Sequence, residues 1–392
     1  MYVPPHDRDG GWRRPGSERH QARIASIDKE RLDTAFELMR SETKNGGLFV
    51  LRHGWLIYER WFGLGHPEAT PNLASCGKPF TSIAMGMLIN ERPDRFPNGL
   101  DEKVYTPEFL PPEAFPPADP RKAEIKLGQL LSFTAGIRGN NPSFVHGQAV
   151  EIDPTGPDGW PAMTDEIALG LEDGKTGDVP YTTSTLWCAP GDGYSYATAS
   201  IHLVSIVLRR IAEMELERYL DLRLGKQLGW GRWSVGYKNT RAGAHTSGGG
   251  GIALRASDML RFGYLLLHEG RWGERQLVPQ EYVRHATRKS PYNPHASYSL
   301  QFDVNTDGIW PNVPRDAFWK GGSGGHALYV VPSLDLVVWK LGGRDEQYQP
   351  SNTGLPLPTA PGYPLDRPGW HSTVDSQLAL RRVLELAVEA CR

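Results

Sequence analysis

Strand-like segments stand at both ends of the chain, and a mostly helical stretch separates them. Residues 47–62 have the pattern of a β-hairpin that turns at His53–Gly54. Residues 327–331 and 334–341 have the same pattern across Pro332–Ser333. If these distant strands pair with one another, the stretch between them must be an insertion. We therefore expect an α+β fold, an α/β sandwich in which an antiparallel sheet is flanked by helices and carries an inserted, mainly helical domain.

The same pattern gives the expected domain boundaries. The discontinuous α/β domain comprises residues 26–98 and 240–392, and the inserted helical domain comprises residues 99–239. Residues 1–25 form an N-terminal arm rich in Arg, Gly, Pro and His, which we expect to be mobile or to lie on the surface. Because the arm has no apolar core like that of a signal peptide, we expect a cytoplasmic location.

Several segments have apolar residues at helical spacing. The clearest runs from Phe80 to Leu88, with the pattern of a helix that is buried on one side and ends before Pro93. Further helices are expected over residues 27–41, 126–132, 165–171, 196–211, 257–267 and 376–390. Two further strands are expected over residues 298–304 and 318–320.

Composition and charge exclude several functions. Lys and Arg total 43 and Asp and Glu total 45, so the formal net charge of −2 provides no basic surface for nucleic acid or an anionic membrane. No apolar run approaches the roughly 18 residues that a membrane span requires. The three cysteines, Cys76, Cys188 and Cys391, are too few for a disulfide framework, and neither they nor the histidines have metal-ligand spacing. We expect a metal-free and cofactor-free enzyme with a small-molecule substrate, no nucleic-acid or membrane partner, and an oligomeric state that the sequence leaves open.

A serine and a lysine stand three residues apart just before the helix that begins near Phe80. On a helix, Ser75 and Lys78 would share one face, so the ammonium group can lie beside the hydroxyl. Pro79 suits the first helical turn, and the helix N-terminus favours a developing alkoxide. A desolvated lysine with a lowered pKa can accept the serine proton, which indicates nucleophilic catalysis. Taken alone, the pair also fits an ordinary helix start followed by an exposed lysine.

Two further motifs follow this pair in a fixed order. A Pro-Gly turn leads to Tyr196 and Thr198, and Lys320 is later followed by Gly321 and Gly322. The order Ser-x-x-Lys, Tyr-x-Ser/Thr, Lys-x-Gly resembles the serine β-lactamase and penicillin-binding-protein superfamily. Within it, the tyrosine motif resembles the class C β-lactamase-related branch, which includes serine esterases and 6-aminohexanoate-dimer hydrolases. The resemblance covers roughly residues 30–390.

This resemblance implies the catalytic roles. Ser75 would be the nucleophile that becomes acylated, and Lys78 would activate it. Tyr196 would be the second acid–base group, with its phenolate favoured by the charges of Lys78 and Lys320. Tyr194 is a rival for this role, but the offset of Tyr196 from the preceding Pro-Gly pair matches the family pattern. Which of Lys78 and Tyr196 is the primary base stays open.

The resemblance also implies how substrate would be held. The backbone N–H groups of Ser75 and of Ser323, which follows Gly322, would form the oxyanion hole. Thr198 stands where the family has Asn, and Gly321 stands where Thr is common. These departures favour carboxylic esters with small or medium acyl groups over β-lactams and D-amino peptides. Amides, including linear amide oligomers, are the alternative substrate class.

Other interpretations of the motifs remain open. Ser323 also matches a G-x-S-x-G elbow followed by Asp335 and His371 in α/β-hydrolase order, although that elbow requires a helix where strand-like residues follow. A literal Lys-Thr-Gly at residues 175–177 precedes Tyr196 and is therefore in the wrong order. A catalytically silent binding module on the same fold would bind ligand without turnover.

Tryptophans in loop-like segments indicate either an aromatic-walled pocket or ordinary core packing. They are Trp160, Trp187, Trp230, Trp233 and Trp310.

Overall fold

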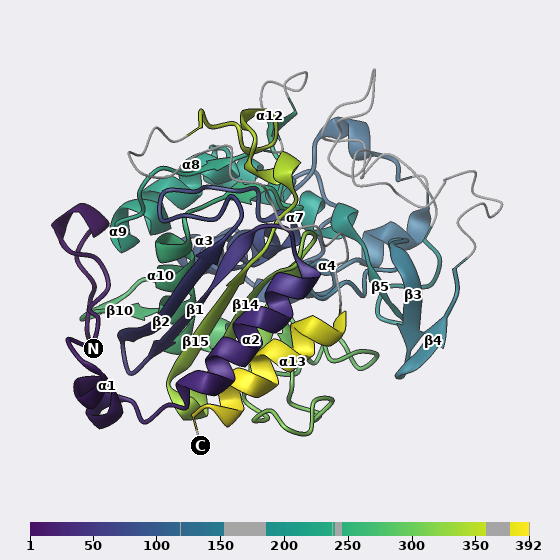
Figure 1. Cartoon of the computed structure of the whole chain (residues 1–392). Coiled ribbons are helices and arrows are strands. Elements are labelled where there is room, and N and C mark those ends of the chain that lie inside the picture. Colours follow the sequence, from purple (N-terminus) through teal and green to yellow (C-terminus); the bar gives the residue numbers. More distant parts are fainter. Residues whose placement is uncertain (118, 153–185, 237, 240–244, 358–376, 392) are drawn as a thin grey trace.

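A six-stranded sheet lies at the centre of the computed structural model, which describes residues 1–117, 119–152, 186–236, 238–239, 245–357 and 377–391. Its strands are β1 (Gly46–Arg52), β2 (Trp55–Phe62), β12 (Asp303–Val304), β13 (Phe318–Gly322), β14 (His326–Val331) and β15 (Leu336–Leu341). The order is β12-β13-β14-β15-β1-β2, and each neighbouring pair is antiparallel (Figure 1). β1 pairs with β15, which confirms that the two ends of the chain share one antiparallel sheet.

The helices and the small sheets complete the described chain. The helices are α1 (Glu18–Ile24), α2 (Lys29–Glu42), α3 (Lys78–Glu91), α4 (Leu127–Ser132), α7 (Thr198–Ala212), α8 (Leu216–Leu220), α9 (Lys226–Leu228), α10 (Ala256–Leu267), α11 (Gln280–Ala286), α12 (Pro350–Thr353) and α13 (Gln377–Glu389). Small antiparallel sheets join β3 (Asn140–Val145) with β4 (Gln148–Val150) and β5 (Tyr194–Tyr196), β6 (Ser234–Val235) with β9 (Ile252–Ala253), β7 (Lys238–Asn239) with β8 (His245–Thr246), and β10 (Arg271–Trp272) with β11 (Arg275–Gln276). The helix expected over residues 165–171 lies outside the described residues.

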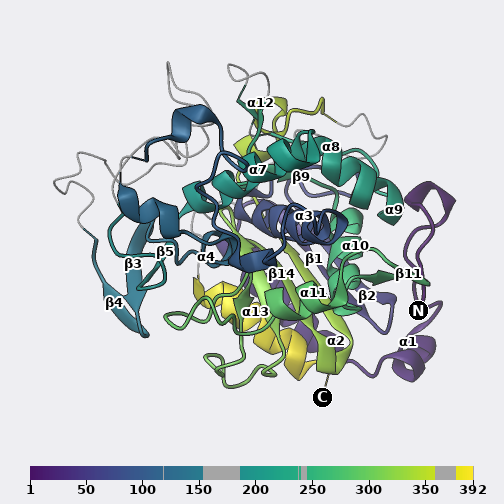
Figure 2. The same ribbon diagram turned by 180° about the vertical axis from the view of Figure 1, so that it is seen from behind.

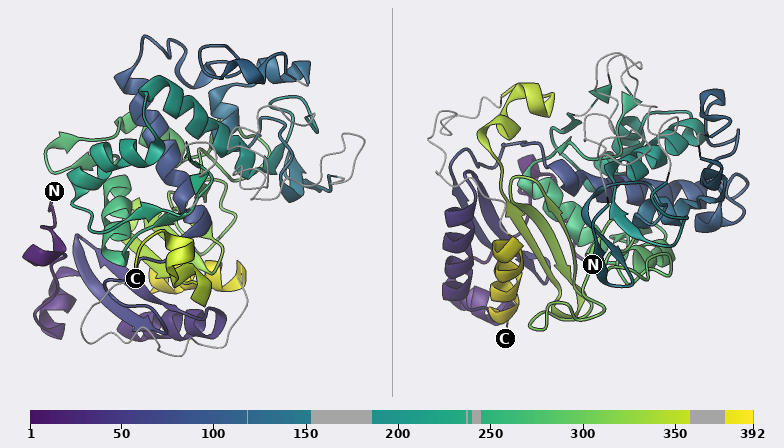
Figure 3. Two further views of the ribbon diagram at one scale, coloured as in Figure 1. Left: turned by 90° about the horizontal axis from the view of Figure 1, so that it is seen from above. Right: turned by 90° about the vertical axis from the view of Figure 1, so that its right-hand side faces the viewer.

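The sheet separates two layers of helices. α2 and α13, from opposite ends of the chain, lie side by side on one face, and α3, α7, α10 and α11 lie on the other (Figure 3). Alternate residues of β1 pack against the two helical layers, because successive side chains of a strand point to opposite faces. Leu48 and Val50 pack with the α2–α13 layer, whereas Phe49 and Leu51 join the core that contains α3 and α10. With helices on both faces, the central strands β14 and β15 are buried along their whole length.

α3 is more deeply buried than the sequence pattern predicts. Every residue from Lys78 to Leu88 is buried, so the prediction of a single buried side is wrong. The reason is that α3 packs against α7, α8 and α11, and it is enclosed on several sides (Figure 2). This enclosure removes Lys78 from solvent.

The prediction of a strand over residues 298–304 is wrong for residues 298–302, since only the last two residues form β12. Ser299 N donates to Phe302 O at 2.7 Å, and Gln301 adopts a φ of 73°, so the chain makes a tight turn there. The Gln301 side chain donates to Leu131 O at 2.6 Å and holds this turn against α4. Apolar content suggested a strand, but a hydrogen bond from the Gln301 side chain to a backbone carbonyl of α4 holds a turn.

The expected helix over residues 196–211 begins two residues later than predicted. Tyr196 is the last residue of β5 and pairs with Asn140 of β3, and α7 starts at Thr198. Ala197 between them is extended, with φ −113° and ψ 103°. This turn from strand into helix places Tyr196 at the edge of the helical layer rather than along α7.

The N-terminal arm contacts the edge of the sheet and α10. Trp12 is 3% exposed, its ring meets Tyr264 edge-on at 5.4 Å, and its Nε1 donates to Ser257 O at 3.2 Å. Arg13 O accepts a hydrogen bond from Leu56 N at 3.0 Å, so the arm covers part of the outer edge of β2. An edge strand covered in this way is protected from pairing with other chains.

One apolar core joins the sheet to the helical layer. It includes Phe49 of the sheet and Leu203 of α7, which lies in the expected helical insertion. The division into residues 26–98 with 240–392 and residues 99–239 stays a prediction. Among the described residues, no helix is both long enough and apolar enough to cross a membrane.

Candidate active site

Ser75 lies in a tight turn at the foot of α3. The turn is a single stretch of 3₁₀ helix, Ala74–Gly77, and Lys78 begins α3 directly after it. Ala74 adopts a φ of 47°, a left-handed conformation that is uncommon for residues other than glycine. Ala74 N donates to Asn72 Oδ1 at 2.9 Å, which helps to hold this conformation. The strained turn presents the Ser75 hydroxyl to the cavity described below.

Lys78 is bonded to the Ser75 hydroxyl, as the sequence spacing predicts. Its Nζ donates to Ser75 Oγ at 2.9 Å and to Gly249 O at 2.6 Å, and the residue is only 1% exposed. The Gly249 carbonyl was not predicted as a partner, although the run of four glycines around it is a visible signal. Close packing requires that run, since a Cβ on Gly250 would lie 2.7 Å from Ala74 O.

Tyr196 faces both lysines. The Lys320 Nζ lies 4.6 Å from the centroid of the Tyr196 ring, and the Lys78 Nζ lies 5.3 Å from it. Burial raises the pKa of Tyr196, but the charges of Lys320 and Lys78 outweigh burial and hold that pKa below its usual value. Burial and the Asp303 carboxylate instead raise the pKa of Tyr194 well above its usual value. The geometry therefore favours Tyr196 over Tyr194 as the acid–base group.

Lys320 is buried on β13 beside an acidic residue that the sequence analysis did not single out. Burial lowers the pKa of Lys320, but Tyr196 and Asp303 outweigh it and raise that pKa. Asp303 comes from β12, opposite Trp319. No motif identifies Asp303, because only the pairing of β12 with β13 brings it to the site.

The end of β13 lies against the Ser75 turn. Cys76 Sγ donates to Lys320 O at 3.3 Å. A Cβ on Gly322 would lie 2.5 Å from Leu73 O and 3.1 Å from Cys76 N, so only glycine permits this approach. Ser323 follows directly, which brings its backbone close to the turn that carries Ser75.

All of the predicted site residues line one cavity of about 790 Å³. Thr198, at the first turn of α7, also faces this cavity. The predicted residues that the fold brings together here are Ser75, Lys78, Tyr196, Thr198, Lys320, Gly322 and Ser323.

The G-x-S-x-G alternative does not fit the geometry. Ser323 stands between β13 and β14, in a strand-turn-strand context rather than before a helix. Asp335 lies in the turn between β14 and β15, where its Oδ2 is 2.9 Å from His53 Nδ1. His371 and the Lys-Thr-Gly at residues 175–177 lie outside the described residues.

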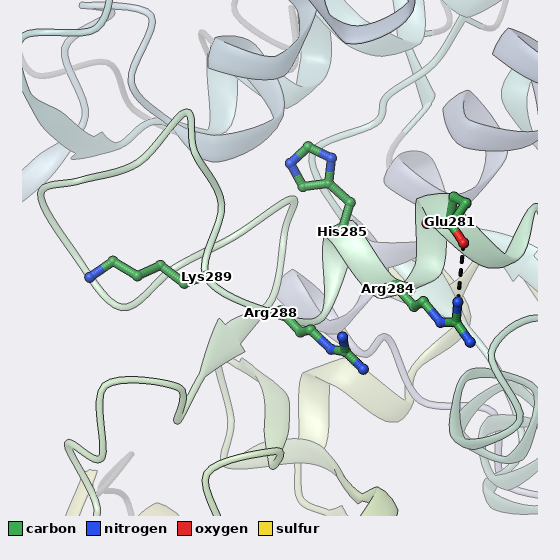
Figure 4. Close-up of a pocket in the computed structure, with 5 residues that line it drawn as sticks. All are labelled: Glu281, Arg284, His285, Arg288 and Lys289. Carbon is green, nitrogen blue, oxygen red and sulfur yellow. Dashed lines mark hydrogen bonds and ion pairs between the residues drawn. The ribbon is translucent and has the colours of Figure 1, made fainter.

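A second pocket, of about 700 Å³, lies beside α11 and shares no lining residue with the first (Figure 4). Arg284 pairs with Glu281 at 3.1 Å, and Lys289 pairs with Asp307 at 2.9 Å. Its lining is Glu281, Arg284, His285, Arg288 and Lys289, and it contains no hydroxyl or thiol nucleophile.

Of the described tryptophans singled out in the sequence, one lines the catalytic cavity and others pack in the core. Trp310 lines the cavity that contains Ser75, whereas Trp187, Trp230 and Trp233 do not. Trp230 packs edge-on against Phe80 and Trp233, and so belongs to the core. Trp160 lies outside the described residues.

A helix-flanked antiparallel sheet with a serine bonded to a buried lysine, a tyrosine and a second lysine on β13 defines the class of β-lactamase-like and penicillin-binding-protein-like serine hydrolases. A sequence profile of the Beta-lactamase family matches residues 33–351, so the chain belongs to that family. No curated protein matches the chain by sequence.

Solved structures share the fold. A putative 6-aminohexanoate-dimer hydrolase from Bacillus anthracis is 22% identical, with a TM-score of 0.58 over 90% of this chain and 84% of its own. A penicillin-binding-protein homologue from Caulobacter crescentus is 15% identical, with a TM-score of 0.60 over 92% and 97%. EstCE1, described as a hydrolase with promiscuous acyltransferase activity, is 19% identical, with a TM-score of 0.57 over 79% and 92%.

Proposed function

We propose that this protein hydrolyses carboxylic esters with small or medium acyl groups through an acyl-enzyme, using only its own side chains and water. The observation that carries the proposal is the 2.9 Å contact between Lys78 Nζ and Ser75 Oγ, next to a tyrosine whose pKa the neighbouring lysines lower. A serine with such partners is an activated nucleophile.

In the proposed first step, Ser75 Oγ attacks the ester carbonyl carbon and its proton passes to the Tyr196 phenolate. The tetrahedral intermediate then expels the alcohol, which takes that proton from Tyr196. Water next attacks the acyl-enzyme, gives its proton to Tyr196 and releases the acid, and the proton returns to Ser75 Oγ. In this scheme Lys78 and Lys320 stabilise the phenolate, and the N–H groups of Ser75 and Ser323 stabilise the oxyanion.

Two positions support esters over β-lactams and peptides. Thr198 lines the cavity where an asparagine would bind an acylamino group, and Gly321 lacks a hydroxyl for a substrate carboxylate. Hydrolysis of linear amides is the second candidate. Asn140, which pairs with Tyr196 and lines the same cavity, offers an amide group, and one structural neighbour is named as a dimer hydrolase of this kind.

The test is labelling with a fluorophosphonate, followed by intact mass and peptide mapping, with p-nitrophenyl butyrate and nitrocefin turnover in parallel. We expect one adduct on Ser75, faster ester than lactam turnover, and a loss of about 10⁴-fold or more in kcat for Ser75→Ala. The control is Ser323→Ala, which retains the nucleophile. Labelling on Ser323 would support the G-x-S-x-G alternative, and neither labelling nor turnover would indicate a binding module.

A further inference from the structure

Part of the lining of the catalytic cavity is apolar, and another part is polar. We call Ile309, Trp310, Trp319 and Leu380 the apolar wall. We call four other lining residues of the same cavity its polar rim: Arg344, Glu346, Gln347 and Asn352. The cavity therefore offers two chemically different surfaces to the two halves of a substrate.

Ile309 is an exposed aliphatic side chain within this wall. It is 47% exposed, and the other large apolar residues of comparable exposure in the described part of the chain are Met1, Val3 and Leu357. None of those three lines the cavity that contains Ser75. An isolated exposed aliphatic residue is ordinary, but one fixed at the mouth of a catalytic cavity contacts whatever enters it.

The loop that carries Ile309 is held rigidly from inside. The side chain of Asn305 is fully buried and accepts a hydrogen bond from Trp310 N at 2.9 Å. Its Nδ2 donates to Trp310 O at 3.1 Å, Val313 O at 2.9 Å and Pro314 O at 3.2 Å. The Asn305 side chain thus binds the backbone at Trp310 and at Val313–Pro314, and we infer that the wall is formed before substrate arrives.

The Trp310 ring is fixed as firmly as its backbone. It stacks on Trp319 with ring centroids 3.8 Å apart and an angle of 15° between planes. Trp319 is itself buried on β13, next to Lys320. The wall therefore has a flat, rigid aromatic component adjacent to the catalytic strand.

Gly321 leaves space between the catalytic strand and α13. The nearest atom to a Cβ built there is Leu380 Cδ1 at 3.7 Å, which is ordinary contact, so no steric conflict requires glycine. A larger side chain would fill the space next to Leu380. Glycine at this position enlarges the apolar side of the cavity.

We propose that the apolar wall is the specificity-determining subsite of this enzyme and binds an unbranched alkyl or aryl substituent of the ester. The inference rests on the proposed function, since it assigns the substrate class of the same site. A methylene buried against this wall is expected to raise kcat/KM about fourfold until the wall is covered.

The experiment measures kcat/KM in two series, p-nitrophenyl esters from acetate to octanoate and n-alkyl butyrates from methyl to hexyl. The series that responds identifies whether the acyl or the alcohol substituent lies on the wall. In that series, Ile309→Ser and Trp310→Ala are expected to reduce the ratio of long-chain to short-chain kcat/KM by about threefold to tenfold. The matched control is Leu357→Ser, which removes a loop aliphatic group of 37% exposure outside the cavity and leaves the ratio unchanged.

Binding to the inactive enzyme separates this inference from the proposed function. Hexyl butyrate is titrated calorimetrically into Ser75→Ala and into Ser75→Ala combined with Ile309→Ser, and the second Kd is expected to be about threefold to tenfold weaker. If the wild type does not hydrolyse esters but this difference in Kd is found, the proposed function is wrong, whereas the inference that the apolar wall binds the substituent is supported. The inference about the apolar wall would be refuted if the wild type and the wall variants had equal chain-length ratios in both series, and if the two Ser75→Ala proteins had equal Kd values. Ester hydrolysis by the wild type would then still support the proposed function.

Discussion

At the scale of the residue, the site depends on charges that burial alone would suppress. Lys320 and Tyr196 are each disfavoured in their charged forms by burial, and each favours the charged form of the other. The lysine therefore favours the phenolate of Tyr196 only while its positive charge is present.

Replacing Lys320 with Gln is expected to move the ascending limb of the pH profile of kcat/KM to higher pH. A phenolate base gains activity as pH rises through its pKa, and loss of the Lys320 cation raises the pKa of Tyr196. At a pH on this ascending limb, kcat/KM of Lys320→Gln is therefore expected to be lower than that of the wild type. The measurement is the pH dependence of p-nitrophenyl butyrate hydrolysis.

The control for that experiment is Arg344→Gln. This substitution also removes a positive charge from the lining of the cavity, but it leaves the Lys320 ammonium group next to the Tyr196 ring. We expect the ascending limb of the pH profile of kcat/KM to lie at the same pH in Arg344→Gln as in the wild type. An unmoved limb in Lys320→Gln, with circular dichroism unchanged, would mean that Tyr196 is not the titrating base.

At the scale of the element, α3 combines the catalytic turn with the centre of the core. Gly86 lies where α3 meets α11, and a Cβ there would come within 2.3 Å of the Tyr282 ring. Tyr282 is itself fixed, since its hydroxyl is 2.9 Å from Ser82 Oγ. The glycine therefore serves close packing between two helices, against its own low helix propensity.

Gly86→Ala is expected to lower the free energy of unfolding by about 1–3 kcal/mol, because overpacking outweighs the gain in helix propensity of about 1 kcal/mol. Urea denaturation measures the change. A double-mutant cycle with Tyr282→Leu is the control, and the two substitutions together should cost less than the sum of the single ones. Additive effects, or a more stable Gly86→Ala, would refute the overpacking.

At the scale of the whole molecule, the N-terminal arm joins the two sides of the fold. Its carboxylate Asp7 lies 3.0 Å from Arg261, which is 1% exposed in α10, and Arg261 also donates to Pro4 O at 3.0 Å. Buried cations without partners are costly, so the arm completes the charge balance of α10.

Trp12→Ala is expected to destabilise the fold by about 3–5 kcal/mol without reducing kcat/KM, since no residue of the arm lines the catalytic cavity. Thermal denaturation and ester hydrolysis at a temperature well below the transition measure the two effects. Arg8→Ala removes a side chain that is 82% exposed and should change neither. Equal melting temperatures for Trp12→Ala and the wild type would show that the arm contributes no stability.

The sequence by itself determined whatever depends on local geometry. Ser75 and Lys78 are three residues apart at a helix start, and helical spacing alone brings their side chains together. The hairpins and the paired ends followed from apolar runs with turn residues between them. The order of the three motifs also identified the superfamily, and the family match confirms it.

Only the tertiary structure decided which distant groups meet at the site. The Gly249 carbonyl, the Asp303 carboxylate and the apolar wall come from segments that no local pattern connects with Ser75. Tyr196 at the end of β5, Lys78 at the start of α3 and Lys320 on β13 meet because the fold brings these three elements together. Local spacing constrains neighbours along a chain, whereas these contacts depend on how the sheet and helices pack, and packing is a property of the whole fold.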